Sequence, residues 1–327
     1  MSWARRRVLV TGAGGFIGSH LVERLVASGA TTKAFVHYRG DGGAGGLDRS
    51  AVRDDVEIVS GDVGDAECVR QAVRGVDVVF HLAALIGIPY SYRAPLSYVR
   101  VNIEGTMNVL QACRDWGVSR VVHTSTSEVY GTAQYVPIDE AHPLKGQSPY
   151  SASKIGADKL AEAFHLSFGL PVVTIRPFNT FGPRQSARAV IPTMIAQALR
   201  SDTILLGNTH VSRDFNYVSN TVDGFLLAGT SAAAVGVTCN IGTGEEVTIE
   251  QLAGAIQQIV KRPVRIERDE TRLRPPSSEV ERLVASRALA EQVLGWRPAV
   301  SFDDGLRLTV DWMRQNEALY RPRVYAI

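Results

Sequence analysis

The sequence predicts an α/β protein with a doubly wound parallel sheet and a smaller C-terminal lobe. Through the first half of the 327-residue chain, short apolar runs alternate with longer amphipathic segments, which is typical of parallel strands joined by helices. A glycine-rich turn follows the first apolar run. After Pro177 the alternation loosens, and loops with Pro and Gly separate shorter elements. We therefore expect two parts, 1–178 and 179–327, with interleaved boundaries.

Each expected element is bounded by the residues that interrupt its apolar pattern. The expected strands are Arg7–Val10, Lys33–Tyr38, Val56–Ser60, Asp77–His81, Arg120–Thr124 and Val172–Arg176. The expected helices are Ile17–Ser28, Asp65–Val73, Leu96–Trp116 and Pro149–Phe168, three of which are followed directly by glycine, as is common at helix C-termini. The segment Arg39–Ser50, with five glycines, is expected to be a mobile loop.

Composition excludes several classes of protein. The formal net charge is only +2, which gives no electrostatic reason to expect a nucleic acid or an anionic membrane as partner. The most apolar stretch, Val78–Ile88, is much shorter than a membrane span. Three widely spaced cysteines form no disulfide framework, so a reducing cytoplasm is expected. The seven histidines lack metal-ligand spacing, and no metal site is predicted.

The turn after the first strand predicts a dinucleotide site. Glycines at 12, 15 and 18 have GxxGxxG spacing, and Gly15-Phe16-Ile17-Gly18 opens the first helix. Glycine lets the backbone approach a pyrophosphate, whose charge is met by free N–H groups and by the helix dipole. Gly18 also lets the helix lie close to the strand. This placement predicts a Rossmann-type sheet that binds NAD(P).

The second strand bears on the choice between NAD and NADP. An acid at its end would accept a hydrogen bond from the ribose 2′-hydroxyl of NAD, but this strand ends in Tyr38-Arg39. An arginine suits a 2′-phosphate, so NADP is slightly favoured, although Arg39 could also merely open the glycine-rich loop. Asp62, after the third strand, is a candidate partner for the adenine amine or a turn former.

An acid–base pair is predicted at the start of the helix 149–168. Ser148 is a suitable N-cap, and Pro149 suits the first turn. Tyr150 and Lys154 are four residues apart and therefore lie on one helix face. A lysine ammonium beside a phenol stabilises the phenolate and lowers the phenol pKa. The spacing thus predicts that Tyr150 serves as a base toward a substrate hydroxyl.

These motifs together resemble the extended short-chain dehydrogenases/reductases, specifically the NAD-dependent epimerases and dehydratases of sugar nucleotides. The likeness covers nearly the whole chain and rests on TGAGGFIG, HLAA at 81–84, STSEVYG at 125–131, YSASK at 150–154, RPFNTFGPR at 176–184 and RDFNYV at 213–218. Within that family, AALIGIPYSY, TSTSEVYGTAQYVPIDE and GPRQSARAVIP are most similar to 4,6-dehydratases of the legionaminic-acid pathway type.

The resemblance implies several binding residues. Val63, Leu82, Ala83 and Ala84 would line the cofactor site, together with Tyr150 and Lys154. Asn179, Arg213 and Arg274 would meet the diphosphate of a nucleotide sugar, a role that suits the bidentate geometry of arginine, although Arg274 could instead form a surface salt bridge. The family also implies a homodimer formed through the helices 96–116 and 149–168.

The family's shared step is oxidation at C4 of the sugar, with Tyr150 accepting the O4 proton and Thr126 assisting. Dehydratases of the family carry a carboxylate after this Thr to remove the C5 proton, and Glu128 stands at that place. On an extended segment Thr126 and Glu128 would share a face. Ser127 stands where glucose-nucleotide dehydratases have Asp, which leaves a 4,6-dehydratase and a uronic-acid decarboxylase both open, and a 4-epimerase is a further alternative. We expect the dehydratase, acting on a UDP- or GDP-N-acetylhexosamine.

A function of another class is a non-catalytic Rossmann protein that senses NADP. The intact set of Thr126, Tyr150 and Lys154 argues against it, because a sensor does not need a base beside the nicotinamide site.

Overall fold

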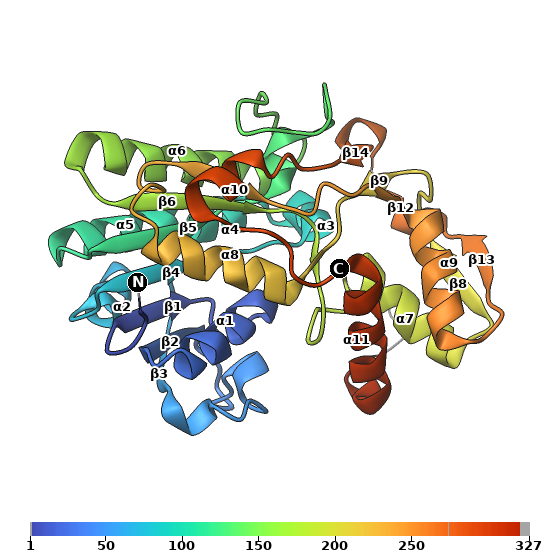
Figure 1. Ribbon diagram of the computed structural model, residues 1–327, viewed down its shortest axis with the longest axis horizontal. Coiled ribbons are helices and arrows are strands. Elements are labelled where there is room, and N and C mark those ends of the chain that lie inside the picture. The colour runs from blue at the N-terminus through green and yellow to red at the C-terminus, as the bar shows by residue number, and fades with distance from the viewer. Residues whose placement is uncertain (1, 274, 321–327) are drawn as a thin grey trace.

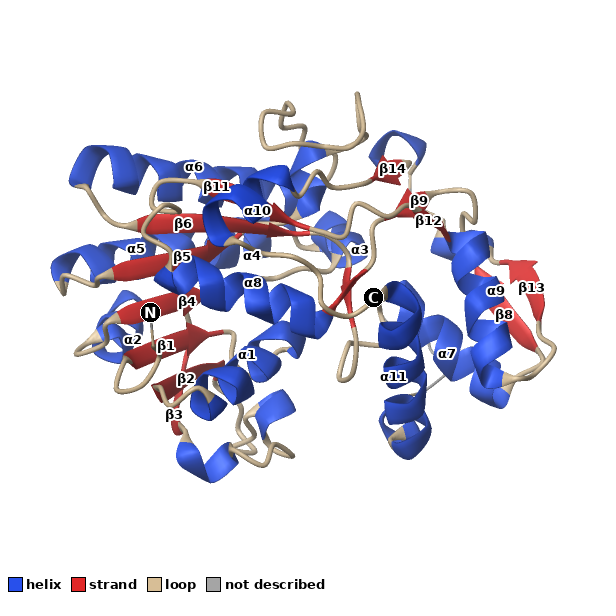
Figure 2. Cartoon of the chain, in the orientation of Figure 1, coloured by secondary structure: helices blue, strands red, loops and turns tan. Residues whose placement is uncertain are grey.

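The computed structural model describes residues 2–273 and 275–320. Its larger part is built on a seven-stranded sheet with the order β11-β6-β5-β4-β1-β2-β3, and all its pairings are parallel (Figures 1 and 2). The strands are β1 (Arg7–Thr11), β2 (Thr31–His37), β3 (Glu57–Gly61), β4 (Val78–His81), β5 (Arg120–Thr124), β6 (Val172–Pro177) and β11 (Thr238–Ile241). The predicted α/β fold class is confirmed.

Helices cover both faces of the sheet. On one face α2 packs against α5 and α5 against α6, and on the other α1 packs against α8 and α8 against α10. Their bounds are α1 (Phe16–Ala27), α2 (Ala66–Val73), α5 (Gly105–Asp115), α6 (Pro149–Phe168), α8 (Val218–Thr230) and α10 (Ala288–Leu294). The sheet is therefore buried on both sides, as its nearly continuous apolar strands require.

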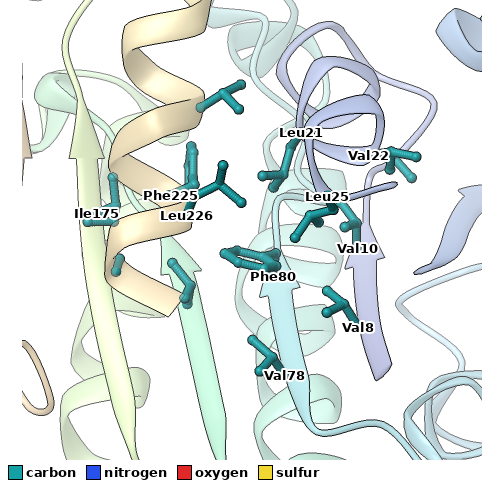
Figure 3. Close-up of a cluster of buried hydrophobic side chains, with 14 of the residues drawn as sticks. Val8, Val10, Leu21, Val22, Leu25, Val78, Phe80, Ile175, Phe225 and Leu226 are labelled. Atoms are coloured by element: carbon teal, nitrogen blue, oxygen red, sulfur yellow. The ribbon is translucent and has the colours of Figure 1, made fainter. Parts of the chain in front are cut away.

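Alternation along the strands divides the interior into two cores. Val8 and Val10 of β1 face the α1/α8 side, where Phe80 and Phe225 also pack (Figure 3). Leu9, between the two valines, belongs to the core under α2, α5 and α6. Burial of each large apolar side chain contributes about 1.5–3 kcal/mol, so both faces stabilise the placement of the strand ends.

The second part lies beyond the carboxyl ends of the sheet strands (Figure 1). Its apolar core is formed mainly by the helices α7, α9 and α11. The helices are α7 (Val190–Arg200), α9 (Ile249–Val260) and α11 (Phe302–Gln315), and the short strands are β7 (Thr180–Phe181), β8 (Thr203–Leu206), β9 (Ser212–Arg213), β10 (Asn216–Tyr217), β12 (Val247–Thr248), β13 (Arg265–Arg268) and β14 (Arg282–Leu283). A lobe at this edge can close over a ligand bound to the sheet.

The chain crosses the predicted division at residue 178 more than once. The strand β11 pairs with β6, and α8 packs on the sheet, although both follow that residue in the sequence. Interleaving of this kind ties the lobe to the sheet by several connections, so the lobe is held close to the strand ends.

The helix predicted over 96–116 forms as one continuous helical segment, 95–115, but it is not α-helical throughout. The segment contains α4 (Pro95–Tyr98), a π-helical turn over Val99–Glu104, and then α5; the short α3 (Ile88–Arg93) precedes it. The side chain of Asn102 in the wide turn is buried, accepts from Leu85 N at 2.8 Å, and donates to Leu85 O at 3.0 Å and to Ser153 Oγ at 2.9 Å. These contacts with a distant loop and α6 explain the turn, which helical spacing alone does not reveal.

The glycine-rich segment Arg39–Ser50 is docked on the protein, contrary to the predicted mobile loop. Ala44 and Leu47 are buried, and Gly46 N donates to Gly14 O at 2.8 Å. A β-carbon on Gly14 would lie 2.6 Å from Ala44 O. The segment therefore packs against the glycine turn, and Gly45, whose β-carbon would lie 2.5 Å from Gly14 O, allows the two backbones to approach closely.

Candidate active site

The predicted cofactor and acid–base residues gather at the carboxyl ends of β1, β4 and β5. The sheet order reverses between β1 and β4, and ligands of doubly wound sheets bind at such a switch point. In Figure 2 these strand ends face the second part of the chain. The site is thus bounded by the sheet on one side and by the lobe on the other.

The glycine turn has the geometry of a phosphate cradle. Gly12 has φ +69° and a β-carbon there would lie 2.7 Å from Ala83 N, while a β-carbon on Gly18 would overlap Gly12 O. Helix α1 begins at Phe16 after Gly15, with no side-chain cap and no acid in its first turn. Its free N–H groups and positive dipole end are therefore open to an anion, and these residues fit the pyrophosphate of a dinucleotide.

Replacing Gly12 with Ala is expected to weaken dinucleotide binding by roughly tenfold or more, about 1.4 kcal/mol. The added methyl group meets the backbone of Ala83 at a positive φ that Ala adopts poorly. Isothermal titration with NAD+ measures the change. Gly254→Ala is the control, because its β-carbon would meet nothing within 4 Å. Equal affinity of Gly12→Ala and the parent protein would contradict this role.

His81, the first residue of the HLAA motif, is buried and orients the loop over the glycine turn. His81 Nδ1 lies 2.8 Å from Thr11 Oγ1, which accepts from the backbone N–H of Leu82 and of Ala83, each at 3.2 Å. His81 Nε2 lies 3.0 Å from Thr106 Oγ1, whose proton goes to Asn102 O. The ring is therefore neutral with its proton on Nε2, and burial holds its pKa far below the ordinary value.

Three other predicted cofactor residues, Asp62, Val63 and Arg39, each make a local hydrogen bond. Asp62 is exposed and accepts from Gly64 N at 2.8 Å, so its role in a turn is clear and its role toward adenine stays a prediction. Val63 is buried, and its carbonyl accepts from Asn108 Nδ2 at 2.9 Å. The guanidinium of Arg39 is exposed and bonds Asp41 Oδ2 at 2.7 Å.

The predicted acid–base pair is buried in the first turns of α6. Ser148 caps the helix, which begins at Pro149 as predicted. The Nζ of Lys154 donates to Thr124 O at 2.6 Å, and the ring of Tyr150 packs edge-on against Tyr98 at 6.2 Å between centroids. Both side chains are thus fixed by neighbours on β5 and α4.

The electrostatics of this pair differ from the prediction. Burial raises the pKa of the Tyr150 phenol well above its ordinary value, a hydrogen bond with Thr126 opposes that rise, and the charge of Glu128 adds to it. Burial also lowers the pKa of the Lys154 amine to about 8. In the protein alone desolvation thus outweighs the stabilisation that Lys154 was expected to give the phenolate.

The segment after β5 is not extended as predicted. Ser127–Tyr130 forms a 3₁₀ turn, and Thr126 caps it by accepting from Glu128 N at 3.3 Å. Ser127 is buried, whereas Thr126 and Glu128 are partly exposed. Thr126 and Glu128 both lie near the Tyr150 phenol, since a hydrogen bond with Thr126 lowers the pKa of the phenol and the charge of Glu128 raises it. The extended geometry expected for this segment is thus wrong, and the shared action of Thr126 and Glu128 on one ligand stays a prediction.

On the substrate side the structure describes two of the three predicted residues. The carbonyl of Asn179 accepts from Asn216 N at 3.1 Å, and its Nδ2 is buried without a hydrogen-bond partner. Arg213 is buried on β9, where it donates to Ser212 O at 2.8 Å and lies 3.8 Å from Glu279. Arg274 lies outside the described residues. The partnerless amide of Asn179 is suited to a ligand oxygen.

The RPFNTFGPR motif also contains a link that sequence spacing did not predict. Arg184 forms a bidentate pair with Glu23 of α1, both contacts being 2.7 Å, and lies 2.8 Å from His20 Nδ1. Glu23 also accepts from Ser50 Oγ at 2.7 Å. The pair joins the helix of the glycine turn, the docked segment and the chain that enters the lobe, so it stabilises their relative placement.

No cluster of three or more His, Cys, Asp or Glu side chains within residues 2–273 and 275–320 could hold a metal ion. No helix in this part of the chain is long and apolar enough to cross a membrane.

Comparison with known proteins identifies the family. The family model described as GDP-mannose 4,6 dehydratase matches residues 9–309. A UDP-glucose 4-epimerase of Mycolicibacterium smegmatis is 35% identical, over 94% of this chain and 98% of its own. The crystal structure of DesIV, a dTDP-glucose 4,6-dehydratase from Streptomyces venezuelae with NAD bound, is 33% identical with a TM-score of 0.86 and covers 97% of this chain and 99% of its own.

A third relative has the same fold. The crystal structure of a UDP-glucuronic acid 4-epimerase from Bacillus cereus, in complex with UDP-glucuronic acid and NAD, is 28% identical with a TM-score of 0.86 and covers 95% of this chain and 99% of its own. These likenesses span the sheet, the site and the lobe together. With the glycine cradle and the buried Tyr150–Lys154 pair, they establish that the chain belongs to the extended short-chain dehydrogenase/reductase family of NAD-dependent nucleotide-sugar epimerases and dehydratases.

Proposed function

We propose that this protein is a nucleotide-sugar 4,6-dehydratase that works through a 4-keto intermediate on a UDP- or GDP-N-acetylhexosamine. The observation that carries the proposal is the position of Glu128. It lies in the 3₁₀ turn after β5 that Thr126 caps, and its charge raises the pKa of the Tyr150 phenol. A 4-epimerase needs one acid–base group, since the keto sugar only rotates before it is reduced. A second group beside the first supports chemistry at the neighbouring C5.

The first step is oxidation at C4. Tyr150 accepts the O4 proton with the help of the Thr126 hydroxyl, to which it is hydrogen-bonded, and the charge of Lys154 would oppose the rise in the phenol pKa that burial causes. The glycine cradle, with Leu82 and Ala83, would hold the dinucleotide, which would supply the hydride acceptor for C4 and the hydride donor for C6. After hydride reaches C6, C5 would be reprotonated by whichever of Glu128 and Tyr150 still carries a proton. The nucleotide diphosphate would lie on Asn179 and Arg213, and its binding energy positions the sugar.

The second step is elimination of water across C5 and C6. The 4-keto group acidifies the C5 proton, and Glu128 removes it as a general base. The electrons of that C–H bond form the C5–C6 double bond as the C6 hydroxyl leaves as water, with its proton supplied by Glu128 or a hydroxyl nearby. Ser127, buried beside Glu128, would orient the leaving oxygen rather than protonate it as an acid.

Product analysis separates this function from its alternatives. The purified protein, NAD+ and either UDP- or GDP-N-acetylglucosamine should give a 4-keto-6-deoxy sugar that has lost the mass of one water. Unchanged mass with inversion at C4 would identify an epimerase, a function that the similarity to the M. smegmatis UDP-glucose 4-epimerase favours. Loss of CO2 from a UDP-uronate would identify a decarboxylase.

The choice of dinucleotide is a separate proposal. The residue Arg39 favours NADP on sequence grounds, but Asp41 already bonds its guanidinium, and the DesIV and B. cereus structures contain NAD. We expect NAD+ to bind more tightly than NADP+, because a 2′-phosphate would lie close to the charge of Asp41. Titration calorimetry with both dinucleotides measures this, and tighter binding of NADP+ would show that Arg39 exchanges Asp41 for the phosphate.

A further inference from the structure

A buried carboxylate lies one turn after Lys154 on α6. Asp158 accepts from His123 Nε2 at 3.1 Å and from Ser125 Oγ at 2.7 Å. It also accepts from Arg176 Nε at 3.3 Å and from Arg176 Nη2 at 3.0 Å. All four side chains are buried. We call these residues (Asp158, His123, Ser125 and Arg176) the Asp158 cluster; it joins α6 to the ends of β5 and β6.

The cluster and Lys154 fix the same short segment. The carbonyl that accepts from Lys154 Nζ belongs to Thr124, which lies between His123 and Ser125. Lys154 therefore holds this segment through its backbone, and Asp158 holds it through the two flanking side chains. Since Thr126 follows directly, the segment also sets where the hydroxyl partner of Tyr150 lies.

The titratable groups around Lys154 lie on each of the elements that surround it. On α6 it has Tyr150 and Asp158, the neutral rings of His81 and His123 lie on β4 and β5, and Arg176 on β6 pairs with Asp158. Glu128 acts on the phenol from its 3₁₀ turn. Asp158 thus has two buried cations as neighbours, and loss of its charge would leave both uncompensated, which is costly at such depth.

We propose that Asp158 is a positioning residue for the Tyr150–Lys154 pair, which keeps Lys154 charged at neutral pH and fixes the end of β5 beneath the sugar site. This rests on the proposed function only in that both use the Tyr150–Lys154 pair. Asp158 does not touch the reacting atoms; it acts through Lys154. Its charge opposes the fall in the amine pKa that burial causes, and it also raises the pKa of the phenol.

Asp158→Asn therefore has a specific signature. Without the carboxylate the amine pKa and the phenol pKa both fall, so the alkaline and the acid limbs of the pH–rate profile should both move to lower pH, by about one unit. Side-chain ¹⁵N NMR of lysine-labelled protein, with Lys154→Arg for assignment, measures the amine titration without any substrate. Its midpoint should move in the same direction by a similar amount.

Three other variants separate charge from structure. Asp158→Glu keeps the charge and should restore the wild-type midpoint. Ser125→Ala removes one hydrogen bond to Asp158 and should lower stability without moving either limb. Glu162→Gln, an exposed carboxylate on the same helix that pairs with Lys159, is the matched control and should change nothing.

The titration of Lys154 tests the role of Asp158 without any substrate. An unchanged Lys154 midpoint in Asp158→Asn, with only a loss of stability, would overturn it. If that variant does not fold, the wild-type titration decides, because an amine already neutral at neutral pH contradicts the proposal and a charged one supports it. If no nucleotide sugar reacts, the proposed function fails while the NMR result still stands.

Discussion

Tyr150→Phe is expected to lower the rate of C4 oxidation by about 10²–10⁴-fold. The variant removes the oxygen that takes the O4 proton and that is hydrogen-bonded to Thr126, while the ring keeps its edge-on contact with Tyr98. Stopped-flow absorbance of the reduced nicotinamide, under single-turnover conditions with a nucleotide sugar, measures this step. The dissociation constant of the dinucleotide and the melting temperature should change little.

A matched control removes a hydroxyl elsewhere. Tyr135 is exposed, and its hydroxyl donates to Asp139 at 2.8 Å, so Tyr135→Phe should leave the oxidation rate within a few-fold of the parent. If Tyr150→Phe were as active as this control, Tyr150 would not be the base. If neither parent nor variant oxidised any nucleotide sugar while both bound the dinucleotide, a sensing protein would become the better explanation.

Glu128→Gln is expected to separate the two steps. Elimination of water should fall by about 10²–10⁴-fold, because the amide cannot remove the C5 proton, whereas oxidation at C4 should persist. The variant should therefore accumulate reduced nicotinamide and 4-keto sugar. Mass spectrometry of quenched samples, together with exchange of the C5 proton for deuterium from D2O, measures both steps, and Glu162→Gln again provides the control.

The same variant predicts a change in pH dependence. The Glu128 carboxylate raises the pKa of the Tyr150 phenol. Its neutralisation should lower that pKa, so the limb of the pH profile that reports the phenol should move to lower pH, while the limb set by Lys154 should stay in place. Elimination at the parental rate in Glu128→Gln would show that another group removes the C5 proton.

Local sequence signals predicted the elements whose bounds are set by neighbouring residues in the chain. The helix Pro149–Phe168 was predicted with its observed bounds, because Ser148, Pro149 and Gly169 are start and stop signals that act within one turn. The glycine turn was equally readable. The π-helical turn at Val99–Glu104 was not, because its cause is the set of contacts that Asn102 makes with Leu85 and Ser153.

In the candidate site, too, residues set by local spacing were predicted, and residues set by contacts between distant elements were not. Tyr150 and Lys154 follow from spacing on one helix, and Glu128 from its place after Thr126. The supporting groups His81 and Asp158 are buried polar residues whose partners lie on other elements, so spacing does not distinguish them from ordinary residues. A polar side chain within an otherwise apolar strand, as at His81, is the available signal, since such a group must be hydrogen-bonded when buried.

A nucleotide sugar labelled with deuterium at C4 tests the central claim most directly. If Tyr150 and Glu128 act in turn as described, the label leaves C4 and appears at C6 of a product that has lost one water, and NMR of that product locates it. A label still at C4 in a product of unchanged mass, or in unreacted substrate under conditions where the dinucleotide binds, would contradict the account.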